Sequence, residues 1–397
     1  MSFFHADRVS ETSTSTGSAT ITLSGANTGF RTFSSATGSV ACYVYCSVVS
    51  RTASEWQIAR YSFNGTTTLT FDTLISSSTG SAVSFTAGTK DVFLVHPSLI
   101  FPNSTAMPGG RLTTESGVPV STTNRTAQAT VYYTAYSSNI IHLWEGANAA
   151  GSGGWRPFYF TEISGSVSAL TSGFNYDVFV YNSGTAALPA LSLAFEQWST
   201  DTARTASIIT RVGSAYVLTS NFSRRYVGTI RMSGAGTTED SLEKRFVWNY
   251  YNAISRPMTR VESTTSWTMS FAGAAVCRVA NSNSANALTI VSGFDDYGIW
   301  ITGRTMGFGS TATIVISGGI GINQNTSYSH NLGTTGYSAL GAISNRASTP
   351  IVITYALAHS PSAGLNTYYW LEYVATTATT GTFYGSSQYG LHGVWSC

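Results

Sequence analysis

Short runs in which residue character alternates recur along the whole chain, and they constrain its fold more than any other feature. In "CYVYC", Cys42, Val44 and Cys46 alternate with Tyr43 and Tyr45. Successive side chains of a β-strand point to opposite faces, so a period of two predicts strands. Gly, Ser and Thr separate these runs at the spacing expected of a sandwich or small barrel. Further runs of this kind are "ATITL", "DVFLV", "NYDVFVY", "YGIWITG" and "PIVITYALA".

The composition supports the same fold class. The chain contains 57 Ser, 56 Thr and 22 Tyr but only 2 Lys among its 397 residues. Strong helix formers are therefore scarce, whereas residues that suit a pleated surface are abundant. A hydrophobic content of 43% argues against disorder and for packed cores. We predict an all-β protein made of several β-sandwiches.

Breaks in the pattern divide the chain into four parts. We expect an N-terminal β domain at residues 1–98, an extended linker at 99–125, a central sandwich at 126–256 and a C-terminal sandwich at 257–397. The linker is assigned because Pro, Gly, Ser and Thr dominate it. The last boundary is placed at Arg256-Pro257, since proline and the residue before it rarely continue regular structure.

Two local patterns suggest how the sandwiches are built. "ALTSGFNYDVFVY" (Ala169–Tyr181) has a glycine turn followed by alternating residues and resembles the tyrosine corner of fibronectin-like domains. The C-terminal block has many short strands with glycine turns and ends on the aromatic strand "GVWSC". This pattern favours a jelly-roll-like sandwich for the last block.

The charge distribution excludes several classes of partner. The net charge is only +2, and the 18 Arg are spread along the chain without a basic stripe. We therefore expect no nucleic-acid partner. No apolar run reaches the length of a membrane span, so we expect no membrane insertion. The first residues lack the basic start and apolar core of a signal peptide, which favours production in a cytosol.

The four cysteines fit a reducing compartment. Cys42 and Cys46 lie four residues apart on one expected strand, roughly 13 Å from each other. A disulfide needs Cα atoms within about 7 Å, so these two cannot pair there. We expect Cys277 to be a small core residue and the thiols to be free. The alternative for Cys397 is a cross-link to another subunit, and the sequence leaves the redox state of all four cysteines open.

Several long stretches resemble proteins of tailed bacteriophages. Asp7–Gly38 and Glu55–Pro97 are similar to an N-terminal module of tail-fibre-like virion proteins, with motifs such as "TLSGA", "EW", "DTL" and "AGTKDVF" in the same order. The stretches "RLTTESGVPVSTTNRTAQATVYYTAY" and "RRYVGTIRMSG" followed by "TTEDSLEKRFVWNYYN" resemble phage structural proteins as well. The likeness covers most of the first 260 residues, is looser in the C-terminal block, and departs from the pattern at "VACYVYC".

The resemblance implies a virion component whose first block attaches it to the particle. It brings no catalytic residue that could be carried over to this chain. The implied partners are other virion proteins of the tail or capsid. Fibre-like proteins of this kind also imply a homotrimer that meets the host surface, where a glycan is a candidate partner.

A search for catalytic, cofactor or metal sites gives none. "GAGTTE", which begins at Gly234, lacks the third glycine of a dinucleotide loop and is expected to be a turn. Asp295 and Asp296 are adjacent and could hold calcium, but we favour a hairpin turn, because calcium would need further oxygen ligands that the spacing does not show. No histidine falls at a metal-ligand spacing with Cys or a carboxylate. The histidines are His5, His96, His142, His330, His359 and His392.

One stretch concentrates charge. Five of the seven residues Glu239–Arg245 are charged, and Glu239, Asp240 and Glu243 could form the paired carboxylates of a glycosidase. Lys244 and Arg245 follow at once and could instead neutralise the acids in a surface ion-pair cluster. "DSLE" matches a capping box, which predicts one helical turn. Since the stretch joins two blocks, we favour a structural seam or a subunit contact over catalysis.

We therefore predict a non-enzymatic phage structural protein, most simply a tail fibre or fibre-like appendage. A capsid decoration or head-fibre protein and a polysaccharide depolymerase are the alternatives. Exposed Tyr and Trp on rigid strands could stack on sugars, although ordinary packing also uses them. The sequence names no binding residue.

Overall fold

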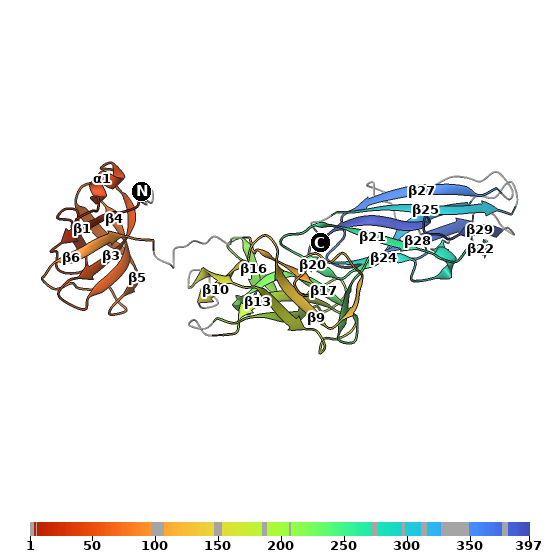
Figure 1. Cartoon of the computed structure of the whole chain (residues 1–397), viewed down its shortest axis with the longest axis horizontal. Helices are drawn as coiled ribbons and strands as arrows, with labels where there is room; N and C mark the ends of the chain where they lie inside the picture. The colour runs from red at the N-terminus through yellow and green to blue at the C-terminus, as the bar shows by residue number, and fades with distance from the viewer. Residues whose placement is uncertain are drawn as a thin grey trace. The chain divides into compact units, whose positions relative to one another are not determined.

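The computed structural model is almost entirely β, which confirms the expected fold class (Figure 1). It describes residues 4, 6–96, 107–146, 153–184, 189–205, 208–270, 277–295, 298–310, 316–326, 349–374 and 380–397. The chain divides into two compact units, one formed mainly by residues 1–104 and the other mainly by residues 105–397. Among the described residues, no helix is long and apolar enough to cross a membrane.

The first unit is built on an antiparallel sheet in the order β1-β6-β3-β4-β5-β2. The strands are β1 (Ser10–Ser13), β2 (Thr20–Thr22), β3 (Cys42–Ser50), β4 (Trp56–Phe63), β5 (Thr68–Ser77) and β6 (Lys90–Leu94). One face of β3 is fully buried through Val44, Cys46 and Val48. The alternation that predicted this strand therefore also identifies its core face. A short helix, α1 (Phe33–Thr37), begins at the N-cap Thr32 and ends at Gly38, whose positive φ favours glycine.

A buried lysine closes one end of this unit. Lys90 has no exposed side-chain surface, and its Nζ donates hydrogen bonds to the carbonyls of Ser15 (2.8 Å), Gly88 (2.8 Å) and Thr86. A buried ammonium must have its three protons accepted, and these three carbonyls do so. The bonds tie the residues between β1 and β2 to the turn before β6.

All four cysteines are free, as expected. Cys42 and Cys46 point into the core of the first unit, and burial raises the pKa of both thiols. Cys277 and Cys397 are buried in the second unit. Because the Cys397 thiol is enclosed, this fold presents no accessible sulfur there for a cross-link to another subunit.

The central part of the second unit is a sandwich. One layer contains a sheet in the order β12-β9-β7 and the pair β10-β11, and the other contains β14-β13-β17. Val131 and Ile163 from the first layer pack with Val178, Val180 and Ile230 from the second. The strands of this part are β7 (Gly110–Thr113), β8 (Arg125–Gln128), β9 (Thr130–Ala135), β10 (Ile140–Gly146), β11 (Gly153–Tyr159), β12 (Glu162–Ser166), β13 (Asn175–Asn182), β14 (Leu191–Gln197), β15 (Ile209–Val212), β16 (Ala215–Leu218), β17 (Asn221–Gly234), β18 (Thr237–Asp240), β19 (Lys244–Arg245) and β20 (Val247–Asn249).

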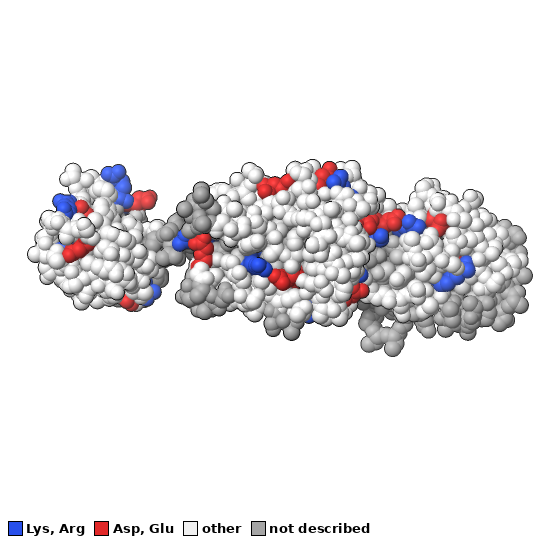
Figure 2. All heavy atoms as spheres, turned by 90° about the horizontal axis from the view of Figure 1, so that it is seen from below, with Lys and Arg blue, Asp and Glu red and all other residues white. Residues whose placement is uncertain are grey.

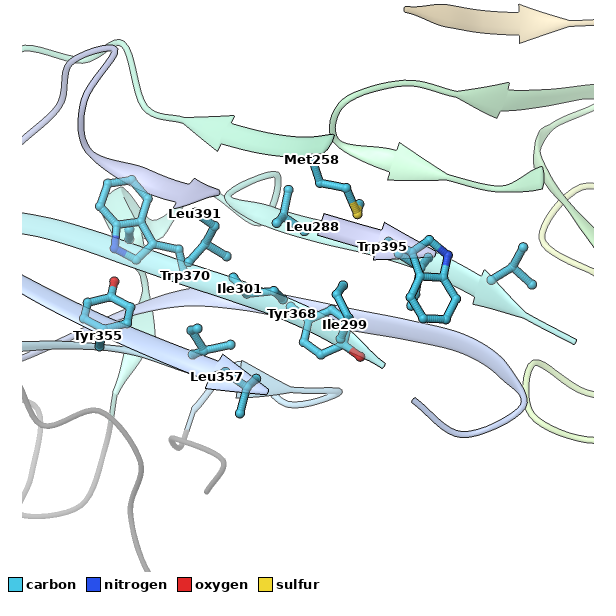
Figure 3. Close-up of a cluster of buried hydrophobic side chains, with 14 of the residues drawn as sticks. Met258, Leu288, Ile299, Ile301, Tyr355, Leu357, Tyr368, Trp370, Leu391 and Trp395 are labelled. Carbon is cyan, nitrogen blue, oxygen red and sulfur yellow. The ribbon is translucent and has the colours of Figure 1, made fainter. Parts of the chain in front are cut away.

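The C-terminal part is a second pair of layers. One layer contains β24, β28, β26 and β23, and the other has the order β21-β30-β25-β29-β22 with β27 beside β25. We call the latter the β25 sheet. Trp370, Trp395 and Ile301 are fully buried between the layers (Figure 3). The elements are β21 (Ser255–Val261), β22 (Ser266–Ser270), β23 (Arg278–Val279), the 3-10 helix η2 (Ala280–Ser282), β24 (Ala287–Ser292), β25 (Ile299–Gly309), β26 (Ile316–Ile322), β27 (Ile351–His359), β28 (Gly364–Val374), β29 (Thr380–Tyr384) and β30 (Gly390–Ser396).

The segment expected as an extended linker differs from that expectation in its described part, residues 107–125. Strand β7 pairs with β9 in the register Gly110↔Ala135, and its four residues are buried. The pairing forms because Leu112 enters the central core and its backbone NH donates to Asn249 Oδ1 at 2.6 Å. The sequence did not predict this strand, because the segment is rich in Pro and Gly and its partners, β9 and Asn249, are distant in sequence.

The turn before β13 is held by a tyrosine hydroxyl. Tyr176 is buried, and its hydroxyl accepts a hydrogen bond from the Thr171 backbone NH at 2.9 Å while donating to Gln197 Oε1 at 2.7 Å. A tyrosine that bonds the backbone a few residues upstream is the defining contact of a tyrosine corner. The contact fixes the turn that leads into the central core.

Replacing Tyr176 by Phe should therefore lower the free energy of unfolding of the second unit by about 1 kcal/mol, because the partly buried hydrogen bonds to the Thr171 NH and the Gln197 amide oxygen are lost. Urea denaturation measures the change as a lower midpoint with an unchanged slope. Tyr159→Phe is the control, since that side chain is 72% exposed and should unfold like the parent protein. Equal midpoints for the two variants would show that the corner contributes nothing.

Candidate functional site

The charged stretch Glu239–Arg245 forms a tight turn between strands, not the helical turn that "DSLE" predicted. Asp240 ends β18 and pairs directly with Arg245 in β19. Ser241 closes the turn, because its NH donates to the Lys244 carbonyl at 2.8 Å and its Oγ accepts from the Lys244 NH at 3.1 Å. The expected capping box is wrong, since the serine hydroxyl satisfies the backbone within a β-turn.

This turn joins the two parts of the second unit into one sheet. β19 pairs antiparallel with β18 and parallel with β24, in the register Lys244↔Thr289 and Arg245↔Ile290. The sheet therefore continues in the order β14-β13-β17-β18-β19-β24-β28-β23. Backbone hydrogen bonds cross the expected boundary at Arg256-Pro257, so the central and C-terminal parts are one structure.

A buried ion-pair cluster lies on this seam. We call Arg111, Asp240, Arg245 and Arg256 the junction cluster, and their exposed fractions are 1%, 4%, 2% and 6%. Asp240 Oδ1 accepts from Arg245 Nη1 at 2.8 Å, and Asp240 Oδ2 accepts from Arg256 Nη1 at 3.2 Å. The ion pairs that the sequence suggested exist, but the expected position on the surface is wrong for Asp240–Arg245, which is buried, whereas the Lys244 side chain in its pair with Glu239 is partly exposed.

The remaining guanidinium protons of the junction cluster hold distant backbone segments together. Arg245 donates to the Pro257 carbonyl at 2.6 Å, and Arg256 donates to the Ser121 carbonyl at 2.7 Å. Arg111 donates to the Pro119 carbonyl at 3.2 Å and to the Cys397 carbonyl at 2.8 Å. Burial lowers the pKa of Arg111, and the cluster also lies beside the Cys397 thiol, whose pKa burial raises.

The other carboxylates of the stretch are paired as well. Glu239 accepts from Lys244 at 3.2 Å and Glu243 accepts from Arg260 at 2.9 Å. A cavity of about 210 Å³ beside this stretch is lined by residues that include Leu242, Arg245, Arg256 and 120–124, and by none of the three acids. The stretch therefore does not present the two facing carboxylates that a glycosidase needs.

A second contact fixes the junction through aromatic rings. Phe294 follows β24, and its ring centroid lies 5.0 Å from that of Tyr216, 5.2 Å from that of Tyr250 and 6.0 Å from that of Trp248. The Arg204 guanidinium lies 4.7 Å from the Phe294 centroid. These contacts place a ring of the C-terminal part among side chains of the central part.

The chain approaches this aromatic group closely at Gly293. An added Cβ there would lie 2.3 Å from the Trp248 ring, so only glycine fits.

The Arg204 side chain that contacts Phe294 is bound by Asp177. The Asp177 carboxylate accepts hydrogen bonds from Arg204 Nε at 2.6 Å and from the Thr229 hydroxyl at 2.8 Å. Burial raises the pKa of the Asp177 carboxyl, whereas Arg204 and Thr229 lower it.

The candidate metal residues do not assemble into a site. Asp295 accepts the NH of Ala363, which lies 68 residues further along the chain, whereas His5, Asp296 and His330 lie outside the described residues. His359 is paired with the Tyr368 hydroxyl and His392 with the Thr259 hydroxyl, both at 2.9 Å. In the part of the chain that the structure describes, no group of three or more His, Cys, Asp and Glu could hold a metal ion.

The structure identifies an exposed aromatic site that the sequence did not name. Trp300 in β25 is 54% exposed and pairs with Val394 on one side and Ala358 on the other. The three residues line a shallow recess of about 410 Å³ together with His359, Ser360, Ser396, Gly298 and Ile299. Alternation in "YGIWITG" separates Trp300 from Ile299 and Ile301, but it does not tell which face points outward.

Charged side chains are sparse around these features. Figure 2 shows one face of the molecule that is mostly uncharged, with many of its basic and acidic groups adjacent to each other. On the outward face of β25, Arg304 is exposed and forms no ion pair with a described residue. The face that Figure 2 shows therefore offers mostly neutral surface to its surroundings.

Comparisons with known proteins give no family. No family model and no curated protein matches the chain. Similar solved structures include the Gx strain of infectious bursal disease virus (8% identity, 98% of this chain and 75% of that chain, TM-score 0.25). A mutant VP2 protein of the same virus in T=1 particles has 11% identity, covers 75% of this chain and 78% of that chain, and has a TM-score of 0.24. An exo-β-1,3-galactanase from Phanerochaete chrysosporium has 10% identity, covers 90% of this chain and 69% of that chain, and has a TM-score of 0.12. At these TM-scores the similarities support no conclusion.

Replacing Asp240 by Asn should destabilise the second unit by about 3–5 kcal/mol, because two buried guanidiniums lose their only carboxylate. Chemical denaturation followed by circular dichroism measures this loss. The matched control is Glu196→Gln, which removes the partly exposed pair with Arg224 and should cost less than about 1 kcal/mol. A loss in Asp240→Asn no larger than that of the control would mean that the junction cluster does not stabilise the seam.

Proposed function

We propose that the chain is a structural protein of a bacteriophage virion, specifically a tail fibre or fibre-like appendage that contributes to host attachment. Its first unit attaches it to the particle, and its second unit presents β-surface to the host. The active form is a homotrimer. Its partners are other virion proteins and a glycan of the host surface.

The observation that carries this proposal is that the carboxylates of the charged stretch all form ion pairs within the second unit. The junction cluster, Glu239–Lys244 and Glu243–Arg260 commit the carboxylates of the charged stretch to internal ion pairs. A carboxylate held in such a pair is poorly placed to act on a substrate. The same bonds fix two sandwiches on a shared sheet, which suits a protein that works through a stiff surface.

The motifs of the first unit support the attachment role. Asp7–Gly38 and Glu55–Pro97 resemble the N-terminal module of tail-fibre-like virion proteins. In the fold these stretches supply β1, β2, α1, β4, β5 and β6, and the buried Lys90 ties them together. The resemblance therefore covers most of the first unit, with the exception of β3 (Cys42–Ser50).

The test is the location of the chain in mature particles. Phage particles purified from a lysate and labelled with an antibody to the first unit should carry gold at the tail in electron microscopy. Gold on the capsid would contradict the tail-fibre proposal and indicate a decoration or head-fibre protein. Particles that lack the chain, by labelling and by mass spectrometry, would overturn the virion proposal altogether.

The oligomeric state is tested on the purified full chain by sedimentation. A homotrimer should sediment with three times the 42.1 kDa mass of the chain. A concentration-independent monomer would contradict the trimer without affecting the location test.

A further inference from the structure

We propose that the outward face of β25 binds an acidic oligosaccharide, with one pyranose ring stacked on Trp300 and an acidic group placed at Arg304. The inference rests on the proposed role in host attachment and assigns a site to it. It commits to a glycan and not to a second copy of this chain.

The first argument is the exposure and rigidity of Trp300. Its side chain is 54% exposed although it lies in the middle of a sheet, with β27 on one side and β30 on the other. A strand paired on both sides fixes the backbone that carries the indole before any ligand arrives. Binding there costs little ordering entropy, which favours affinity for a small ligand.

The second argument is the chemistry of the recess around the indole. A sugar ring has an apolar face of C–H groups and a rim of hydroxyls. Trp300 and Val394 supply apolar surface, whereas His359, Ser360 and Ser396 supply polar groups at the margin. The Nδ1 atom of His359 is engaged by Tyr368, which leaves Nε2 as the ring nitrogen for a ligand. A mainly apolar recess with a few polar groups is the usual form of a small-ligand site.

The third argument is the direction in which the site extends. Trp300, Thr302 and Arg304 alternate along β25, so they share its outward face. Four residues of strand place Arg304 about 13 Å from Trp300. Thr302 lies between them and pairs with His392 and Ala356. A short oligosaccharide spans this distance, with hydroxyl and imidazole groups beneath it.

The fourth argument is charge. Arg304 is exposed and forms no ion pair with any residue that the structure describes. The described strands of the β25 sheet place no Asp or Glu on this face. Besides Arg304, their outward positions carry His392, Gly390, and Ser, Thr, Pro, Tyr and apolar residues. A lone guanidinium on a neutral face favours a carboxylate or phosphate group of the ligand.

The test uses the full chain on an array of printed neutral and acidic bacterial-surface oligosaccharides. The parent protein should bind a subset of acidic glycans. Trp300→Thr, which keeps a residue suited to a strand, should weaken this binding about tenfold or more. Arg304→Gln should reduce the binding of acidic glycans only. The remaining binding of these glycans should no longer depend on salt concentration. Tyr159→Thr is the control, an exposed aromatic elsewhere in the same unit, and should bind like the parent.

Several outcomes would overturn the inference. These are a parent protein that binds no glycan on the array, a Trp300→Thr variant with unchanged binding and melting temperature, and an equal loss in Tyr159→Thr. A Trp300→Thr variant that changes oligomeric mass but not glycan binding would assign the face to a second copy of the chain. Each of these can occur while the chain is present in particles, so failure of this site is distinct from failure of the virion proposal.

Discussion

The Asp240 carboxylate and the two guanidiniums that it binds form the contact on which the second unit depends. Removing these groups from water is costly, and close geometry with most protons accepted offsets that cost, although the buried Arg245 Nε has no hydrogen-bond partner among the described residues. Arg245 reaches Pro257, Arg256 reaches Ser121, and both meet the one carboxylate. A small change in the angle between the sandwiches would leave a buried charge without a partner. The main effect of the junction cluster is therefore to favour one angle between the two sandwiches, and its net contribution to the free energy of folding is smaller.

The shared sheet and the aromatic contact reinforce that selection. β19 carries backbone hydrogen bonds from β18 to β24, and Phe294 enters a group of rings from the central part. Hydrogen bonds, ion pairs and ring packing thus all join the central part to the C-terminal part. The β25 sheet, with Trp300 on its outward face, is consequently held on a rigid support. This rigidity links the charged turn to the proposed glycan site, although the turn itself contacts no ligand.

Sequence patterns predicted what depends on local periodicity and missed what depends on distant partners. The strand at Cys42–Ser50 followed from alternation, because its buried face repeats every second residue. "DSLE" was misinterpreted as a capping box, since its role depends on Arg256, sixteen residues away, and on β24. Arg111 lies in a segment that resembles a linker, yet it donates to the Asn252 and Cys397 carbonyls. Trp300 could be assigned to a face of β25, but only the packed sheet showed that this face is outward.

Hydrogen exchange across the seam tests the central claim most directly. The amides of Phe246 and Thr289 donate to the Glu239 and Glu243 carbonyls. Native-state exchange with mass spectrometry should show β13, β17, β19, β24 and β28 opening with a single free energy, as one cooperative unit. The account is contradicted if peptides from β24, β25 and β30 exchange through an opening that leaves β13 and β17 protected.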